Sequence, residues 1–167
     1  LAYDLGSGVR LDNQLQYSRS NTERVSVPMG NGGAHMDSRD FSEELRASFK
    51  APDNSLSGMA GVYYNNVDAD DLLYLRGTSS FHDKKDSLGV FSEVTWRLAP
   101  QWSLTGGLRY QHDSVKRNGA SSAARMPLAF DETYHKLLPK VSLAYDVSPD
   151  WTVGALVSGG YNPGGAG

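Results

Sequence analysis

The sequence predicts an all-β protein, part of an antiparallel transmembrane β-barrel, and three observations support this fold class. Apolar and polar residues alternate with a period of two along several stretches. Each stretch has about 9–11 residues, the length with which a tilted strand crosses a bilayer. Short and long polar connections follow one another alternately along the chain. This layout is typical of outer-membrane barrels, which have short turns on the periplasmic side and long loops on the external side.

The composition is compatible with this fold and excludes other classes. Hydrophobic residues make up 39% of the chain and its mean hydropathy is −0.46. Barrel strands alternate lipid-facing with lumen-facing residues, so such averages resemble those of soluble proteins. The formal net charge of −3 offers no basic patch for nucleic acid, and we expect no such partner. The absence of cysteine excludes disulfides and thiolate metal sites.

The clearest expected strand covers residues 102–112. Its even positions form an apolar face with aromatic ends: Trp102, Leu104, Gly106, Leu108, Tyr110 and His112. Its odd positions form a polar face: Ser103, Thr105, Gly107, Arg109 and Gln111. The same alternation predicts strands at 9–17, 41–50, 56–66, 90–98, 137–145 and 151–161, after a first short strand that ends at Leu5.

The connections are expected to alternate in length. Short turns are predicted near residues 4–8, 52–55, 99–101 and 147–150, and long loops near 20–40, 67–87 and 113–134. Aromatic residues on the apolar register lie near both ends of the strands, as in the girdles of membrane barrels. They are Phe49, Trp96, Trp102, Tyr145 and Trp151 near the turns, and Tyr17, Phe41, Tyr64, Tyr110 and Tyr161 near the loops. A soluble β-sandwich is the alternative, because its strands also alternate.

The polar face of these strands is strongly charged. It carries Arg10, Asp12, Glu44, Arg46, Lys50, Glu93, Arg97, Arg109 and Lys140. Such a face cannot form a dry core, so it lines a wet lumen, contacts a polar plug or pairs its own charges across strands. These possibilities leave both a wide barrel and a small salt-bridged barrel open.

Four sequence motifs resemble the TonB-dependent outer-membrane receptors, particularly those for siderophores. They are RDFSEELR at 39–46, GLRY at 107–110, LLPKVSLAYD followed by SPDWT at 137–152, and SGGYNPGG at 158–165. They occur in the order in which the family has them. The resemblance implies a 22-stranded barrel around an N-terminal plug, in the bacterial outer membrane. It also accounts for Pro139, which cannot donate to a strand ladder.

From this resemblance we expect residues 1–167 to be a segment of a receptor barrel domain, with the plug and the remaining strands absent. The implied function is active import of a scarce nutrient, in particular a ferric siderophore. The implied partners are outer-membrane lipid, that small-molecule ligand and the TonB energy-coupling complex, which is reached through the missing N-terminal part. The alternatives are a passive diffusion porin or small structural barrel, and in third place an outer-membrane hydrolase.

The candidate substrate-contacting residues are those on the polar face near the external rim: Tyr63, Asn65, Arg109 and Gln111. The hydrolase alternative depends on the adjacent pairs His82-Asp83 and His112-Asp113. Neighbours on a strand point to opposite faces, so the members of such a pair do not contact each other. We therefore expect no catalytic residues.

An acidic stretch is the other possible site in the sequence. Asp68, Asp70 and Asp71 could offer oxygen ligands to a hard cation. They do not form a complete ligand set, and a solvated acidic segment is the favoured interpretation. We expect no metal site and no cofactor.

Overall fold

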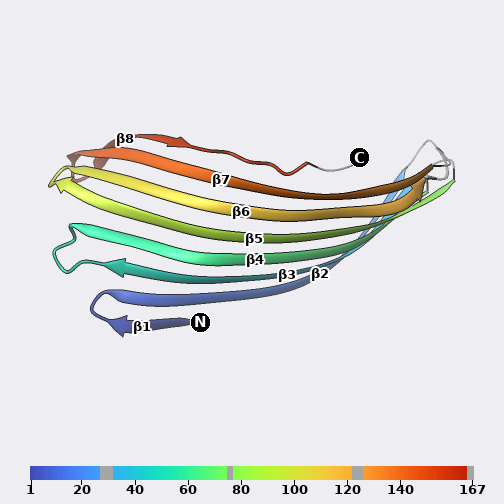
Figure 1. The fold of residues 1–167 in the computed structure, drawn as a ribbon, viewed down its shortest axis with the longest axis horizontal. Helices are drawn as coiled ribbons and strands as arrows, with labels where there is room; N and C mark the ends of the chain where they lie inside the picture. Colours follow the sequence, from blue (N-terminus) through green and yellow to red (C-terminus); the bar gives the residue numbers. More distant parts are fainter. Residues whose placement is uncertain (27–31, 75–76, 122–125, 165–167) are drawn as a thin grey trace.

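A computed structural model describes residues 1–26, 32–74, 77–121 and 126–164. The chain forms one antiparallel sheet of eight strands, in which each strand pairs with the next one along the sequence (Figure 1). The strands are β1 (Ala2–Gly6), β2 (Val9–Ser26), β3 (Gly32–Lys50), β4 (Leu56–Tyr74), β5 (Thr78–Ala99), β6 (Trp102–Ser121), β7 (Met126–Ser148) and β8 (Trp151–Ser158). Among the described residues, none lies in a helix long and apolar enough to cross a membrane.

The short turns lie where the sequence predicts them, at one end of the sheet. Between β3 and β4, Asp53 accepts hydrogen bonds from the backbone N–H and the hydroxyl of Ser55, at 3.0 and 2.7 Å. These bonds lower the pKa of the Asp53 carboxyl. The next residue, Asn54, has a positive φ of 56°, which asparagine tolerates. Gly8 is required in the first turn, because a Cβ there would collide with the Lys50 carbonyl oxygen.

The strands are longer than the sequence pattern predicts. Strands β2 to β7 have 18–23 residues, and most of the expected long loops at 20–40, 67–87 and 113–134 are strand. The ladders reach the pairs Ser26–Gly32, Tyr74–Thr78 and Ser121–Met126. These extensions are mostly polar, and their scattered apolar residues, such as Leu72, Leu73 and Phe81, form no sustained apolar alternation that would mark them in the sequence. Backbone pairing does not require that alternation.

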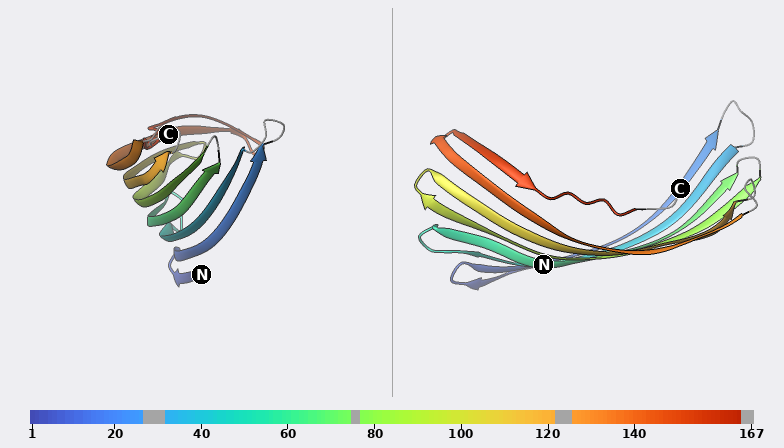
Figure 2. Two further views of the ribbon diagram at one scale, coloured as in Figure 1. Left: turned by 90° about the vertical axis from the view of Figure 1, so that its right-hand side faces the viewer. Right: turned by 45° about the horizontal axis from the view of Figure 1, so that its top comes forward.

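The sheet is strongly curved (Figure 2), and its two faces differ. On one face, side chains meet across an intervening strand: Lys140 with Glu93, Arg117 with Asp71, and Arg109 with the Tyr63 ring. Side chains two strands apart converge only where a sheet curves toward them, so we call this the concave face. It carries the charged residues that the sequence assigns to a lumen. The opposite, convex face carries the apolar register.

An apolar band crosses the convex face from strand to strand. One of its rows runs through Leu45, Val62, Val90, Tyr110 and Leu137, which are paired in register across β3 to β7. Its side chains are uncovered: Val90 is 47% exposed, and Trp96 near the turns is 54% exposed. Aromatic contacts mark both ends of the band, Trp102 with Tyr145 and Phe41 with Tyr64.

Nothing in the described part of the chain packs against this band. The described residues form a single sheet, and Ala69 is its one buried apolar residue. A soluble β-sandwich would cover its apolar face with a second sheet. An uncovered apolar band with aromatic residues at both ends is suited to the hydrocarbon of a bilayer instead. The fold is therefore that of a transmembrane β-barrel segment, as the sequence predicts.

Candidate functional site

The four residues that the sequence singles out line one pocket on the concave face. Tyr63 and Asn65 come from β4, and Arg109 and Gln111 come from β6. The pocket has a volume of about 310 Å³. Its other lining residues are Lys85, Ser87, Asp113, Leu138, Tyr161 and Pro163. The structure thus brings the four candidates together, and their contact with a substrate stays a prediction.

Strand register explains this convergence. Tyr63, Gly89 and Gln111 are paired across β4, β5 and β6. The next row toward the external end consists of Asn65, Ser87 and Asp113. Side chains in such rows share one face of the sheet. The pocket therefore straddles the external edge of the apolar band, on the opposite face of the sheet.

A ladder of side-chain hydrogen bonds holds three successive concave residues of β6. Arg109 Nε donates to Gln111 Oε1 at 2.9 Å, and Gln111 Nε2 donates to Asp113 Oδ1 at 3.0 Å. Gln111 and Asp113 are only 8% and 2% exposed. Asn65 is held by the neighbouring strand, since its Nδ2 donates to Asp40 Oδ1 at 2.7 Å. These hydrogen bonds set the orientation of the polar side chains along the wall.

The charge of Arg109 is not neutralised within the described part of the chain. Its guanidinium lies over the rings of Tyr63 and Phe91, at 5.8 and 5.9 Å from their centroids. None of the ion pairs among the described residues involves Arg109 or Lys85. The pocket contains these two cations and one carboxylate, that of the buried Asp113. The net charge is therefore positive, which favours an anionic ligand.

The sequence analysis missed the other six lining residues, and three of them show why. Lys85 and Asp113 fall in segments expected to be loops, although both continue the polar register of the strands. Extending the period of two by a few residues would have found them. Tyr161 was expected on the apolar register, and this is wrong, since it lines the concave pocket. Strand β8 ends at Ser158, so the alternation no longer determines the direction of Tyr161.

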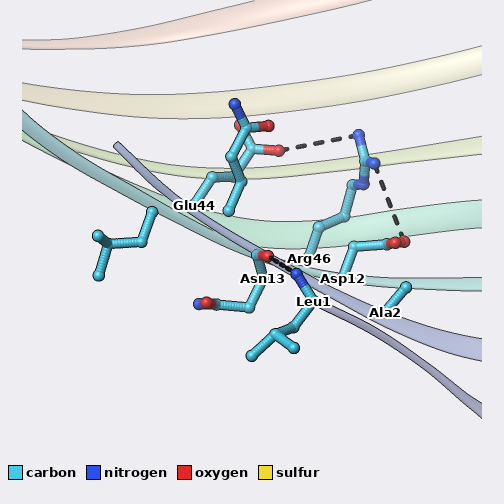
Figure 3. A pocket seen from close by; sticks show the side chains of 8 residues that line it. Leu1, Ala2, Asp12, Asn13, Glu44 and Arg46 are labelled. Atoms are coloured by element: carbon cyan, nitrogen blue, oxygen red, sulfur yellow. Dashed lines mark hydrogen bonds and ion pairs between the residues drawn. The ribbon is translucent and has the colours of Figure 1, made fainter. Parts of the chain in front are cut away.

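A second pocket lies beside β1 and is shown in Figure 3. In it Arg46 points between Glu44 and Asp12, at 3.7 and 3.9 Å. Asp12 also pairs with Arg10 at 2.8 Å. These charges neutralise one another, so this pocket offers less to a charged ligand than the pocket around Arg109 does.

The acidic stretch at 68–71 divides between the two faces. Asp68 and Asp70 lie on the convex side with His82, whose Nδ1 is 2.9 Å from Asp70 Oδ1. This hydrogen bond raises the pKa of His82. Asp71 lies on the concave face, so the three aspartates do not form one site. His82 and Asp83 also point to opposite faces, as the strand geometry predicts.

Arg117 connects three strands at the external end of the concave face. Its guanidinium pairs with Asp83 at 2.7 Å and Asp71 at 3.5 Å, and it lies 4.6 Å from the Phe81 ring centroid. The side chains of Arg117, Asp71 and Asp83 are 23%, 15% and 29% exposed. Burial raises the pKa of Asp83. Arg117 is thus a structural cation between two carboxylates, unlike Arg109.

Replacing Arg117 with alanine is expected to loosen the external ends of β4, β5 and β6. The two carboxylates would lose their shared cation at a partly solvated site, which costs about 1–2 kcal/mol. Hydrogen exchange in these strand ends of the full-length protein should accelerate roughly 5–30-fold.

Two conditions should reverse this effect of Arg117→Ala. Adding Asp83→Asn removes the repulsion between the carboxylates of Asp71 and Asp83, which Arg117 no longer separates. Lowering the pH through the pKa of Asp83, which burial raises above its ordinary value of 3.8, neutralises the same group. Because the folded state then binds the extra proton, the defect should be largest at neutral pH and fade on acidification. Unchanged exchange at neutral pH would show that Arg117 does not hold the strands together.

Known proteins with similar sequences and folds agree with this architecture. A family model described as TonB dependent receptor-like, beta-barrel, matches residues 1–167. The pesticin receptor of Yersinia pestis is 26% identical over 133 residues, which cover 74% of this chain and 20% of that protein. A pesticin receptor of Yersinia enterocolitica is 25% identical over the same length. The chain thus spans about a fifth of these relatives.

Solved structures share the fold. The ferric yersiniabactin uptake receptor FyuA from Yersinia pestis matches with a TM-score of 0.69 and 20% identity, over 92% of this chain and 26% of that one. The ferric citrate transporter FecA matches with a TM-score of 0.74 and 13% identity, over 94% and 25%. The siderophore receptor PiuA from Acinetobacter baumannii matches with a TM-score of 0.73 and 14% identity, over 88% and 29%. Since the family model matches the whole chain and the fold agrees, this chain belongs to the TonB-dependent receptor β-barrel family.

Proposed function

We propose that the chain is a segment of a longer receptor that imports a ferric siderophore across the bacterial outer membrane. Barrels of this family lie in that membrane, and the relatives and structural neighbours named above are receptors and transporters. In this proposal, a plug and an N-terminal segment outside the chain couple the barrel to TonB, which supplies the energy. The remaining strands of the barrel also lie outside the chain.

The observation that carries the proposal is the guanidinium of Arg109, which has no ion-pair partner among the described residues and lies in a hydrogen-bonded polar pocket. Ferric chelates bind iron through anionic oxygens and often have a net negative charge. A guanidinium offers several donors in one plane, which suits carboxylate and similar oxygens. Lys85 adds a second cation, and Tyr63 supplies an aromatic surface. We infer that Tyr63, Asn65, Arg109 and Gln111 contact the ligand on the lumen wall.

Replacing Arg109 with alanine in the full-length receptor is expected to weaken binding of an anionic ferric chelate. Losing a hydrogen bond to a charged group costs about 1.5–3 kcal/mol, which is roughly a 10–150-fold loss of affinity. The probes are ferric citrate, ferric yersiniabactin and a ferric catecholate, and quenching of intrinsic fluorescence reports binding. Arg109→Lys should recover part of the loss, because it retains the charge without the planar fork.

Arg97→Ala is the matched control, because Arg97 carries the same charge near the turns and does not line this pocket. Uptake of radioactive iron by iron-starved cells should require both Arg109 and an energised inner membrane. Uptake that persists after addition of a protonophore would favour a passive porin. Equal affinities of the Arg109→Ala and Arg97→Ala variants would contradict the role of Arg109.

A further inference from the structure

The backbone of β5 passes directly beneath Arg109 at Gly89. A Cβ on Gly89 would lie 2.5 Å from Arg109 Nη2, 2.9 Å from Arg109 Cζ and 3.1 Å from Gln111 Oε1. The two distances to Arg109 are too short for unbonded atoms, and the distance to Gln111 is tighter than usual. The guanidinium therefore occupies the space that a side chain at position 89 would fill.

Backbone conformation does not explain this glycine. Gly89 is not among the glycines with positive φ in the described residues, which are Gly6, Gly8 and Gly77. A glycine inside a strand weakens the strand, and it often marks a close approach of another group. Here the approaching group is the guanidinium of Arg109. The absence of a side chain at position 89 therefore serves the placement of Arg109.

The neighbouring position on the same wall repeats this arrangement. A Cβ on Gly61 would lie 2.7 Å from Phe91 Cζ, so the Phe91 ring lies flat against β4. Arg109 lies over that ring in turn. Gly106 gives the contrast on the convex face, where a Cβ would meet nothing within 4 Å. Phenylalanine rings also cover Gly58 and Gly119, whereas the group that covers Gly89 is the guanidinium of Arg109.

We propose that Gly89 is a positioning residue, which sets the height of the Arg109 guanidinium above the sheet and thereby the affinity of the pocket for anionic ligands. The effect on ligands rests on the proposed function, whereas the placement of Arg109 does not. With a methyl group at position 89, the guanidinium must leave the wall. It then loses its contacts with the Phe91 and Tyr63 rings. Its hydrogen bond to Gln111 is lost as well, and Gln111 also orients Asp113.

The first test needs no ligand. Full-length receptor is treated with phenylglyoxal, and modification of Arg109 is followed by peptide mass spectrometry. Gly89→Ala should accelerate modification of Arg109 several-fold, because the guanidinium no longer lies against the wall. Gly106→Ala is the matched control, and it should leave the rate unchanged. Equal rates in the wild type and the Gly89→Ala variant would overturn the proposal.

The second test is a double-mutant cycle with Arg109→Ala, using ferric citrate, ferric yersiniabactin and a ferric catecholate as probes. Gly89→Ala alone should weaken binding several-fold, and it should add nothing once Arg109 is absent. An equal loss in both backgrounds would overturn the proposal, because Gly89 would then act without Arg109. If Arg109→Ala itself has no effect, the proposed ligand role of Arg109 fails, and the modification rates still decide the role of Gly89.

Discussion

The 167 residues by themselves are expected not to insert into a membrane as a folded monomer. The sheet has two open edges, β1 and β8, and both edge strands are short. Beyond them, β2 and β7 present long unpaired stretches within the described residues, since backbone pairing reaches only Asn13 on β2 and Pro139 on β7. In hydrocarbon each unsatisfied backbone group costs several kcal/mol, so an edge of roughly ten residues costs tens of kcal/mol. The total stability of a protein is typically only about 5–15 kcal/mol.

Refolding of the isolated segment into lipid vesicles tests this expectation. Unheated gel electrophoresis should show aggregates or edge-paired oligomers, although far-UV circular dichroism reports β structure. The same segment within the full-length receptor should migrate as part of a compact, heat-modifiable monomer. A compact monomer of the isolated chain would mean that the open edges find partners within these 167 residues, which contradicts the open sheet.

A charge placed in the middle of the convex band is expected to destabilise the full-length receptor strongly. Val94 is 41% exposed, and its row, with Gly58 and Gly106, lies between the two ends of the band. Arginine at the bilayer midplane of a barrel costs about 2–4 kcal/mol. Val94→Arg should therefore lower the free energy of unfolding by this amount, measured by urea titration in lipid vesicles.

Thr95→Arg provides the matched control on the next residue, whose side chain lies on the concave face. There it loses one hydrogen bond between Thr95 and Thr105, at 2.8 Å, which is worth about 0.5–1.5 kcal/mol. The arginine itself would join a wet surface that already carries Lys50 in the same row. A larger loss for Thr95→Arg than for Val94→Arg would show that the faces are assigned the wrong way round.

The location of the membrane-spanning strands could be predicted from the sequence because hydrocarbon imposes a strict pattern. Every second residue must be apolar for one strand length, as from Trp102 to Tyr110, and aromatic residues gather near the ends. The external extensions escaped prediction for the same reason. On 20–26 or 113–121 both faces meet water or other polar groups, so no side-chain alternation marks the strand. Only the backbone ladder defines it.

The candidate site divides in a similar way. The shared position of the four candidate residues could be predicted from strand register and from their distance to the external rim. Residues on one face and near one rim of a sheet must be neighbours. The four are Tyr63, Asn65, Arg109 and Gln111. Charge pairing does not follow from register. Arg109 and Arg117 both lie on β6, and both point to its concave face. Yet Arg117 is neutralised by two aspartates and Arg109 by none within the described residues.

By itself, the sequence determined the membrane-spanning parts of the strands, the faces that these parts present and the rim from which the candidate residues come, since period and length are local properties of the chain. The tertiary structure alone decided which charges are left uncompensated and why position 89 has no side chain. The contact of Arg109 with Tyr63 depends on the curvature of the sheet, which brings together side chains from strands that are not neighbours. The contact at Gly89 depends on the conformation of the Arg109 side chain on the neighbouring strand β6. No local pattern in the sequence encodes either contact.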